Sequence, residues 1–211
     1  MLKKFLIFSC AVWLCACAGG NVRKTVPTAR PHKRVNFFTD GRTQAAFKVV
    51  GQMNEDYVEG VLRVKKIGEA DYDVVLMTGA AYRVLHATVS PEGVAYRYLF
   101  KDADTALIRG RITQFLNLLL TEADVLQKRR VKGDVTTVTY QGKDAKERFF
   151  YRAEELYPYA AQSVTLLNTA DLTYGEYAPA GPAGEEQVPH SLVYKDGNIT
   201  LDLTLISLRE K

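Results

Sequence analysis

The residue best placed to do chemistry is a cysteine near the amino terminus. The stretch Leu14-Cys15-Ala16-Cys17 follows a basic start, Lys3 and Lys4, and an apolar run over residues 5–14. This order is typical of a secretory leader peptide, and the run is shorter than the roughly 20 apolar residues that a membrane-spanning helix needs. The ending Leu-Cys-Ala-Cys matches a bacterial lipobox, whose last cysteine forms a thioether with diacylglycerol and becomes the mature amino terminus. We therefore expect lipid attachment at Cys17.

This expectation limits what the remaining cysteines can do. Of the three cysteines, Cys10 and Cys15 would leave with the leader, so the mature chain has no disulfide, thiolate nucleophile or cysteine metal site. A diacylglyceryl thioether plus an amide-linked chain exceeds the two signals that stable membrane anchoring requires. Ala18, in place of the aspartate that retains enteric lipoproteins in the inner membrane, favours the outer membrane, facing the periplasm. The alternative is an ordinary leader cut near Ala18.

The length and charge of the chain indicate one globular domain on a basic tether. Of 211 residues, 47% are hydrophobic and 25% charged, which is typical of a globular protein. We expect a leader over residues 1–16, a lipidated cysteine and flexible tether over 17–42, and a domain over 43–211. The formal charge of +4 comes from the first 42 residues, because from residue 43 onward 20 Lys and Arg face 23 Asp and Glu. A slightly acidic domain argues against binding to nucleic acid.

The other residues that could do chemistry do not form a catalytic or metal-binding pattern. The three histidines, His32, His86 and His190, have no nearby His, Cys or paired carboxylate in the sequence. Asp71 and Asp73 share one face of an expected strand, but two carboxylates without a third ligand are weak evidence for a cation site. The sequence also lacks H-E-x-x-H, G-x-S-x-G, Walker and G-x-G-x-x-G motifs. We therefore expect neither an enzyme nor a metal site nor a cofactor.

The first part of the domain reads as five strands joined by short loops. Residues 57–66 and 71–77 alternate between apolar and polar side chains, as half-buried strands do. The turn Ser90-Pro91-Glu92-Gly93 precedes a strand over residues 94–100. Short loops predict an antiparallel meander over residues 46–100, because parallel strands need long crossovers.

The second part begins with a helix and then returns to strands. Apolar residues recur at helical spacing over residues 107–120, with Asp102 as the expected cap. We expect a second short helix or an extension over 122–128, and strands over 134–140, 146–152, 188–194 and 199–208. Residues 169–187, rich in Gly, Pro, Ala and Glu, read as an irregular loop.

Aromatic and apolar strand faces suggest a cavity beneath the helix. Twelve Tyr and nine Phe are many for this length, and a curved sheet that is too wide to fill its own interior can enclose an apolar cavity. A packed core under the helix is the alternative explanation. The expected lining residues are Val58, Leu62, Tyr72, Val74, Leu76, Tyr96, Tyr98 and Leu203 from the strands, with Ile112, Phe115 and Leu119 from the helix.

The order of these elements resembles that of the LolA/LolB superfamily. The stretch Val74-Val75-Leu76-Met77-Thr78-Gly79-Ala80-Ala81-Tyr82-Arg83-Val84-Leu85, continuing to Ser90-Pro91-Glu92-Gly93, is similar to a LolB hairpin. Val188-Pro189-His190-Ser191-Leu192 and residues 199–208 are similar to its end. The resemblance covers residues 44–208. It implies an α+β, mainly β fold: an antiparallel incomplete (half) β-barrel with an amphipathic helical lid over a cavity that holds acyl chains.

One departure from LolB affects the expected activity. LolB carries an exposed leucine on the loop of this hairpin, used to deliver cargo to the membrane, whereas here the loop is Thr78-Gly79-Ala80-Ala81. The expected strand tryptophans are also absent, since the sole tryptophan is Trp13. We therefore expect a lipoprotein that binds a lipid or acyl-bearing ligand for trafficking or envelope biogenesis. The rivals are a module that docks on an envelope protein complex and a hydrolase of envelope polymers.

Overall fold

A computed structural model describes residues 32–38, 41–53, 56–120, 125–142, 145–180 and 186–210. The leader and the lipid-attachment residue Cys17 lie outside the described residues. Residues 31–211 form one compact unit, and its hydrophobic core is built from residues between Val35 and Leu208. This unit therefore holds a core of its own. Among the described residues, no helix is long and apolar enough to cross a membrane.

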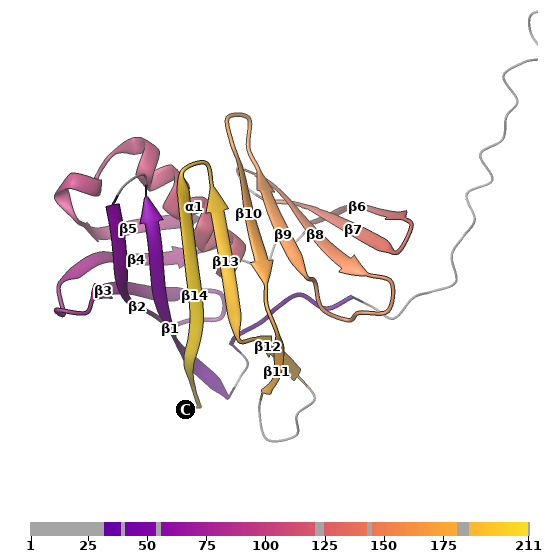
Figure 1. Cartoon of the computed structure of the whole chain (residues 1–211), viewed down its shortest axis with the longest axis horizontal. Helices are drawn as coiled ribbons and strands as arrows, with labels where there is room; N and C mark the ends of the chain where they lie inside the picture. The colour runs from indigo at the N-terminus through magenta and orange to yellow at the C-terminus, as the bar shows by residue number, and fades with distance from the viewer. Residues whose placement is uncertain are drawn as a thin grey trace, which may run out of the picture. The chain divides into compact units, whose positions relative to one another are not determined.

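The fold is a single wide antiparallel sheet with one helix, which confirms the expected open half-barrel and lid (Figure 1). The twelve strands follow the order β5-β4-β3-β2-β1-β14-β13-β10-β9-β8-β7-β6. The sheet is not closed into a barrel, because β5 and β6 are its two edges. The last strand, β14, pairs with β1 on one side and β13 on the other, so it joins the two halves of the sheet.

The first half is the expected meander. Its strands alternate between buried and partly exposed side chains, as in β4, where Leu85, Ala87 and Val89 are buried. A short 3-10 helix and then the one α-helix of the described residues follow β5. The elements of this half are β1 (Arg42–Met53), β2 (Asp56–Lys66), β3 (Tyr72–Thr78), β4 (Arg83–Ser90), β5 (Gly93–Leu99), η1 (Lys101–Ala103) and α1 (Ala106–Leu120).

The second half runs from the other edge back to the centre of the sheet. A separate two-stranded sheet, formed by β11 and β12, lies outside the main sheet. The elements are β6 (Val125–Lys132), β7 (Val135–Gln141), β8 (Lys146–Arg152), β9 (Ala160–Val164), β10 (Thr169–Tyr174), β11 (Tyr177–Ala180), β12 (Glu186–Pro189), β13 (Ser191–Asp196) and β14 (Ile199–Glu210).

Three local expectations are wrong. The helix begins at Ala106 rather than after Asp102, because the Thr105 hydroxyl accepts the Ile108 amide at 3.3 Å and so caps it. The second helix or extension expected over 122–128 is wrong from residue 125 onward, because Val125–Lys132 pairs with β7 as an edge strand, and residues 122–124 lie outside the described residues. The expected loop over residues 169–187 contains β10, β11 and the start of β12. In β10 every second residue is buried, so this segment belongs to the core.

Candidate functional site

The site is the concave side of the sheet, where α1 covers only part of the strands. The carboxyl-terminal half of α1 points its apolar face inward, and its buried residues are Gln114, Phe115, Leu116, Leu118, Leu119 and Leu120. Phe115 packs edge-on against Tyr194 of β13, with 5.0 Å between the ring centroids. At the other end of the helix, the Tyr96 hydroxyl donates to the Arg109 carbonyl at 2.7 Å. These contacts hold the helix over the sheet.

A segment from before β1 occupies the space that the helix leaves open. We call residues 32–38 the strap. Phe37 and Phe38 are 2% and 3% exposed; Phe37 packs against Phe47 of β1, and Phe38 packs against Tyr72 of β3. No strap residue belongs to a strand. The sequence predicts that the strap is part of the flexible tether, whereas its side chains form part of the core.

The other end of the strap is held by polar and aromatic contacts with the second half of the sheet. The Lys33 amide donates to the Leu156 carbonyl at 2.8 Å. Arg34 Nη2 lies 3.1 Å from Glu147 Oε2, and its guanidinium lies over the Phe149 ring at 4.5 Å. Burial raises the pKa of the Glu147 carboxyl, while the Arg34 charge acts in the opposite direction. The pair places one buried ionic contact at the edge of an apolar site.

His32 adds a contact that depends on its protonation. Its ring stacks on Tyr151 with 4.3 Å between centroids, and its Nε2 lies 3.1 Å from Arg129 Nη2. Because arginine only donates, Nε2 must be unprotonated to accept this bond. Burial, and next the Arg129 charge, lower the pKa of His32. The neutral ring is therefore the form that fits the folded strap.

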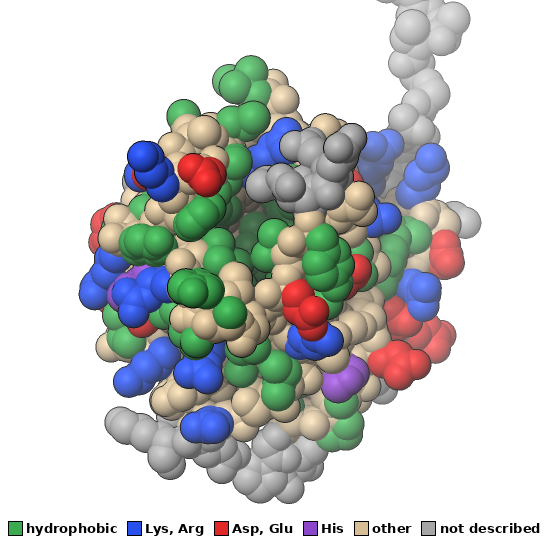
Figure 2. Space-filling view, turned by 60° about the vertical axis from the view of Figure 1, so that its left-hand side comes forward, with side chains coloured by type: hydrophobic (Ala, Val, Ile, Leu, Met, Phe, Trp, Pro, Cys, Tyr) green, Lys and Arg blue, Asp and Glu red, His purple; other side chains and the backbone are tan. Residues whose placement is uncertain are grey.

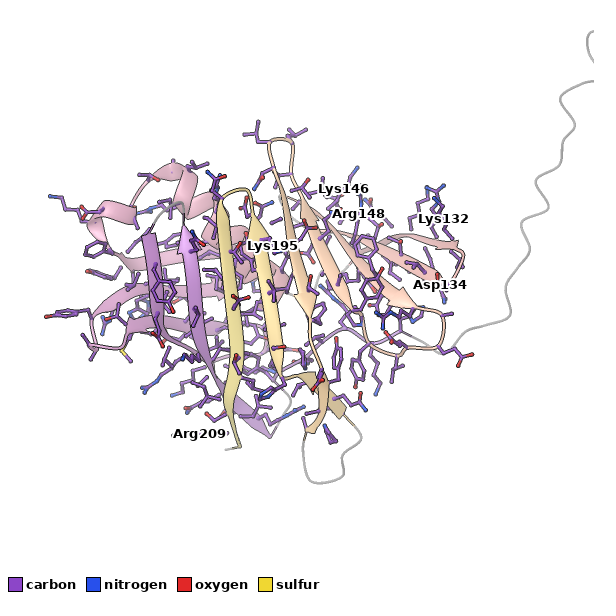
Figure 3. The ribbon with its side chains drawn as sticks, viewed as in Figure 1. Lys132, Asp134, Lys146, Arg148, Lys195 and Arg209 are labelled. Carbon is purple, nitrogen blue, oxygen red and sulfur yellow. The ribbon has the colours of Figure 1, made fainter. Side chains whose placement is uncertain are left out.

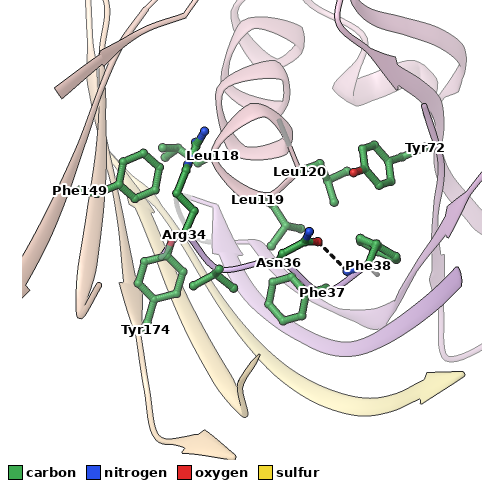
Figure 4. Close-up of a pocket in the computed structure, with 11 residues that line it drawn as sticks. Arg34, Asn36, Phe37, Phe38, Tyr72, Leu118, Leu119, Leu120, Phe149 and Tyr174 are labelled. Atoms are coloured by element: carbon green, nitrogen blue, oxygen red, sulfur yellow. Dashed lines mark hydrogen bonds between the residues drawn. The ribbon is translucent and has the colours of Figure 1, made fainter. Parts of the chain in front are cut away.

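A small cavity lies between the strap, the last turn of α1 and the sheet (Figure 4). Its volume is about 20 Å³, which is room for about one water molecule. Its lining is mainly apolar, with one charged side chain. The lining residues are Arg34, Val35, Asn36, Phe37, Phe38, Tyr72, Leu118, Leu119, Leu120, Phe149 and Tyr174. At this place the strap fills most of the space between α1 and the sheet, because Phe37 and Phe38 are buried there.

The structure distributes the eleven expected lining residues over several environments. Tyr72 and Leu119 line the cavity. Tyr98 is 43% exposed and lies at the surface. Val58 is only partly buried. The remainder belong to the core or pack against it: Leu62, Val74, Phe115 and Leu203 are buried, while Leu76, Tyr96 and Ile112 are partly buried.

Sequence reasoning missed the strap as part of the site. Two adjacent phenylalanines, Phe37 and Phe38, in an otherwise polar and basic segment were the available sequence signal. Tyr174 was missed because it lies in a stretch whose composition predicts a loop. Figure 2 shows hydrophobic side chains gathered round a hollow in the face that it presents. Among the described residues, no group of three or more His, Cys, Asp or Glu is placed to hold a metal ion.

Comparison with known proteins relates this geometry to solved structures. No family model and no curated protein sequence matches the chain. A LolA superfamily protein from Nitrosomonas europaea superimposes with a TM-score of 0.57 and 12% identity, over 82% of this chain and 88% of that one. A domain described as outer membrane lipoprotein-sorting, from Vibrio parahaemolyticus, superimposes with a TM-score of 0.51 and 10% identity, over 81% and 86%. The chain therefore has the LolA/LolB-like fold that its sequence resembles.

Proposed function

We propose that this protein is a membrane-anchored lipoprotein that binds a lipid or acyl-bearing ligand on the concave side of its half-barrel. The observation that carries the proposal is an open sheet whose apolar interior is covered by one helix and by a strap outside the strand pairing. The Vibrio parahaemolyticus domain with the same fold is described as lipoprotein-sorting, which supports the same class of ligand. The role is binding and transfer rather than catalysis.

Ligand entry requires a change in the strap. A cavity of about 20 Å³ cannot hold an acyl chain, whereas the space filled by Val35, Phe37 and Phe38 is apolar and continuous with the cavity. Burying each methylene of an acyl chain contributes about 0.8 kcal/mol. A long chain can therefore outweigh the contacts of two phenylalanine side chains. We infer that the ligand takes the place of these side chains.

Uptake of a fluorescent fatty acid tests this proposal, with one variant that should increase uptake and one that should reduce it. We call the apolar space beneath α1 and the strap the groove. In residues 31–211, Phe37→Leu together with Phe38→Leu should increase uptake, because smaller apolar side chains leave more of the groove free while the core is kept. Leu119→Trp should reduce uptake by filling the cavity, and Leu107→Trp, on the exposed face of the same helix, is the matched control. Unfolding cannot mimic this pattern if circular dichroism is unchanged. Equal uptake by all variants would refute groove binding, and native mass spectrometry would identify any copurified lipid.

We also propose that residues 1–16 are a leader and that the lipidated residue is Cys17, followed by a basic tether and anchored in the outer membrane facing the periplasm. The basic charges of the tether complement anionic headgroups. Mass spectrometry of the amino-terminal peptide from purified membranes tests the anchor, and palmitate labelling should disappear in Cys17→Ser. An unmodified Cys17, or labelling that survives the substitution, would contradict it.

A docking module for an envelope protein complex is the second candidate. It is favoured by the small cavity and by edge strand β6, in which all eight residues are exposed. Crosslinking in intact membranes from positions in β6 would identify such a partner. Three results together would favour this function over lipid binding. They are a native mass that shows no bound lipid, no uptake of fatty acid, and a specific crosslink from β6.

A further inference from the structure

The turn of the β9–β10 hairpin presents two fully exposed leucines to solvent. Leu166 and Leu167 form the tip of the turn, with 103% and 98% of their surface exposed. Figure 1 shows this hairpin reaching past the neighbouring β13–β14 turn. Large apolar side chains that are this exposed usually mark an interaction site when others gather beside them.

Hydrogen bonds within the turn hold the tip, and they engage three of its four amides, those of Thr165, Leu167 and Asn168. The Thr165 amide donates to the Asn168 carbonyl at 2.9 Å, and the amides of Leu167 and Asn168 donate to the Thr165 hydroxyl at 3.3 and 3.0 Å. The Asn168 side chain donates to Asp196 Oδ1 at 2.6 Å and to Gln114 Oε1 at 3.2 Å. Amides that are already bonded can enter hydrocarbon at little cost.

Further apolar residues share the rim of the sheet that carries this tip. Strand pairing places the β3–β4, β9–β10 and β13–β14 turns at one rim, together with the start of β2, the end of β5 and the start of β6. We call this the leucine rim. Its exposed large apolar residues are Tyr57, Tyr82, Phe100, Val125, Leu126, Leu166 and Leu167. At the opposite rim, the exposed large apolar residues include Ile67, in the turn after β2, and Val131, near the end of β6.

Basic side chains stand just behind the tip. Lys146 of β8 is paired opposite Val164, the last residue of β9, and Arg148 is paired opposite Gln162. Figure 3 shows both beside the upper part of β9. A bilayer surface changes from acyl chains through the interface to anionic headgroups, and the side chains follow the same order. Apolar residues form the tip, tyrosines lie along the same rim, and cations lie farther from the tip along the strands.

We propose that the leucine rim docks on the surface of a lipid bilayer with anionic headgroups, with Leu166 and Leu167 entering the acyl region. A second copy of the chain fits less well, because a narrow tip buries little of the roughly 800 Å² per partner that a stable protein interface uses. The proposal goes beyond ligand binding in the groove, since it concerns a different surface and holds whether or not the groove takes a ligand.

Binding to vesicles tests this surface. Residues 31–211, which contain their own core and lack the lipid anchor, should cosediment with vesicles of phosphatidylethanolamine and phosphatidylglycerol. Leu166→Ser with Leu167→Ser should weaken binding about 100-fold, in line with the loss of two buried leucine side chains. The matched control, Ile67→Ser with Val131→Ser, removes exposed apolar residues from the opposite rim and should leave binding unchanged. Phosphatidylcholine vesicles should bind more weakly than anionic ones.

A fluorescence measurement locates the tip directly. Residues 31–211 contain no tryptophan, so Leu167→Trp introduces a single reporter, which brominated lipids should quench strongly. Ile67→Trp is the control and should not be quenched. Equal quenching of both, equal weakening by both serine pairs, or no effect of the tip pair would overturn the proposal. So would concentration-dependent dimerisation that only the tip pair abolishes, which would assign the rim to protein association.

Discussion

The strap and the β9–β10 tip each carry two adjacent large apolar residues, and their environments are opposite. Phe37 and Phe38 are buried, although they lie outside every strand, while Leu166 and Leu167 are fully exposed, although two paired strands hold them. Burial in this molecule therefore does not follow from membership of the sheet. It follows from whether a side chain faces space that the sheet leaves unfilled.

The width of the sheet explains this difference. One helix of 15 residues covers only part of a sheet of twelve strands, so apolar residues on the concave side need another cover, and the strap provides it. The tip lies beyond the end of the strands, where none of the described elements covers it. Phe37 and Phe38 therefore stabilise the domain, whereas Leu166 and Leu167 remain available to bind another molecule or a membrane.

Phe37→Ala should have the largest effect on the free energy of unfolding, and it tests the comparison of the strap with the β9–β10 tip most directly. Removing a buried phenylalanine side chain typically lowers the free energy of unfolding by about 3–5 kcal/mol. Leu167→Ala, at a fully exposed position, should change it by less than about 0.5 kcal/mol. Urea denaturation of residues 31–211 measures both. Similar values for the two variants would show that the strap is not part of the core.

Arg34→Met should be next in size, because it leaves Glu147 buried without the Arg34 charge. Breaking one partner of a buried pair costs about 3–5 kcal/mol, and we expect the lower end at neutral pH because Arg34 is partly exposed. Burial already raises the pKa of Glu147, and losing Arg34 raises it further. The variant should therefore regain stability as the pH falls and Glu147 becomes protonated. Adding Glu147→Met should recover most of the loss; no recovery would contradict this assignment.

Asn168→Ala should have a smaller effect and would sharpen the description of the tip. It removes the donor to buried Asp196 and should cost about 1–2 kcal/mol. The tip should also become more mobile, which faster hydrogen exchange of the Leu167 amide would report. Leu166→Ser, which keeps these hydrogen bonds, should leave the exchange rate unchanged. An unaffected rate in Asn168→Ala would mean that the turn alone holds the tip.

His32→Phe should have the smallest effect on the free energy of unfolding, well under about 1 kcal/mol. The effect should depend on pH, because it arises from the titration of His32. Because the pKa of His32 is lowered in the fold from its ordinary value of 6.5, the unfolded chain binds more protons between the two values. Its contribution to stability is therefore complete above the ordinary value and is lost as the pH falls from that value through the lowered pKa of the folded state. Phenylalanine keeps the stack on Tyr151 and removes the titration. Denaturation midpoints across this range should converge at low pH if the assignment holds.

Much of the fold could be predicted because alternation and short turns are local properties. Strands β2 to β5, the β7–β8 pair and β14 follow from period-two patterns, and the helix follows from its apolar spacing. Strand β10 also alternates, with Ala170, Leu172 and Tyr174 buried, but Gly and Pro residues downstream suggested a loop. Strand β6 could not be predicted from alternation, because both of its faces are exposed.

The site was less predictable, because it depends on distant segments meeting. Of the expected lining residues, Tyr72 and Leu119 lie at the cavity. Tyr98 is exposed on an edge strand, near a register shift between His86 and Ala87. Whether Phe37 is buried depends on the volume left between α1 and the sheet. No local pattern around residue 37 contains that information.

The exposed edge strand β6 has a consequence for the behaviour of the protein at high local concentration. An open sheet presents unpaired backbone groups at its edges, which can template strand addition from another copy and so polymerisation. Strand β6 carries Lys128, Arg129, Arg130 and Lys132 in eight residues. Two such edges repel each other on approach. The sheet can therefore stay open at this edge without growing into fibrils, even when many copies are crowded together.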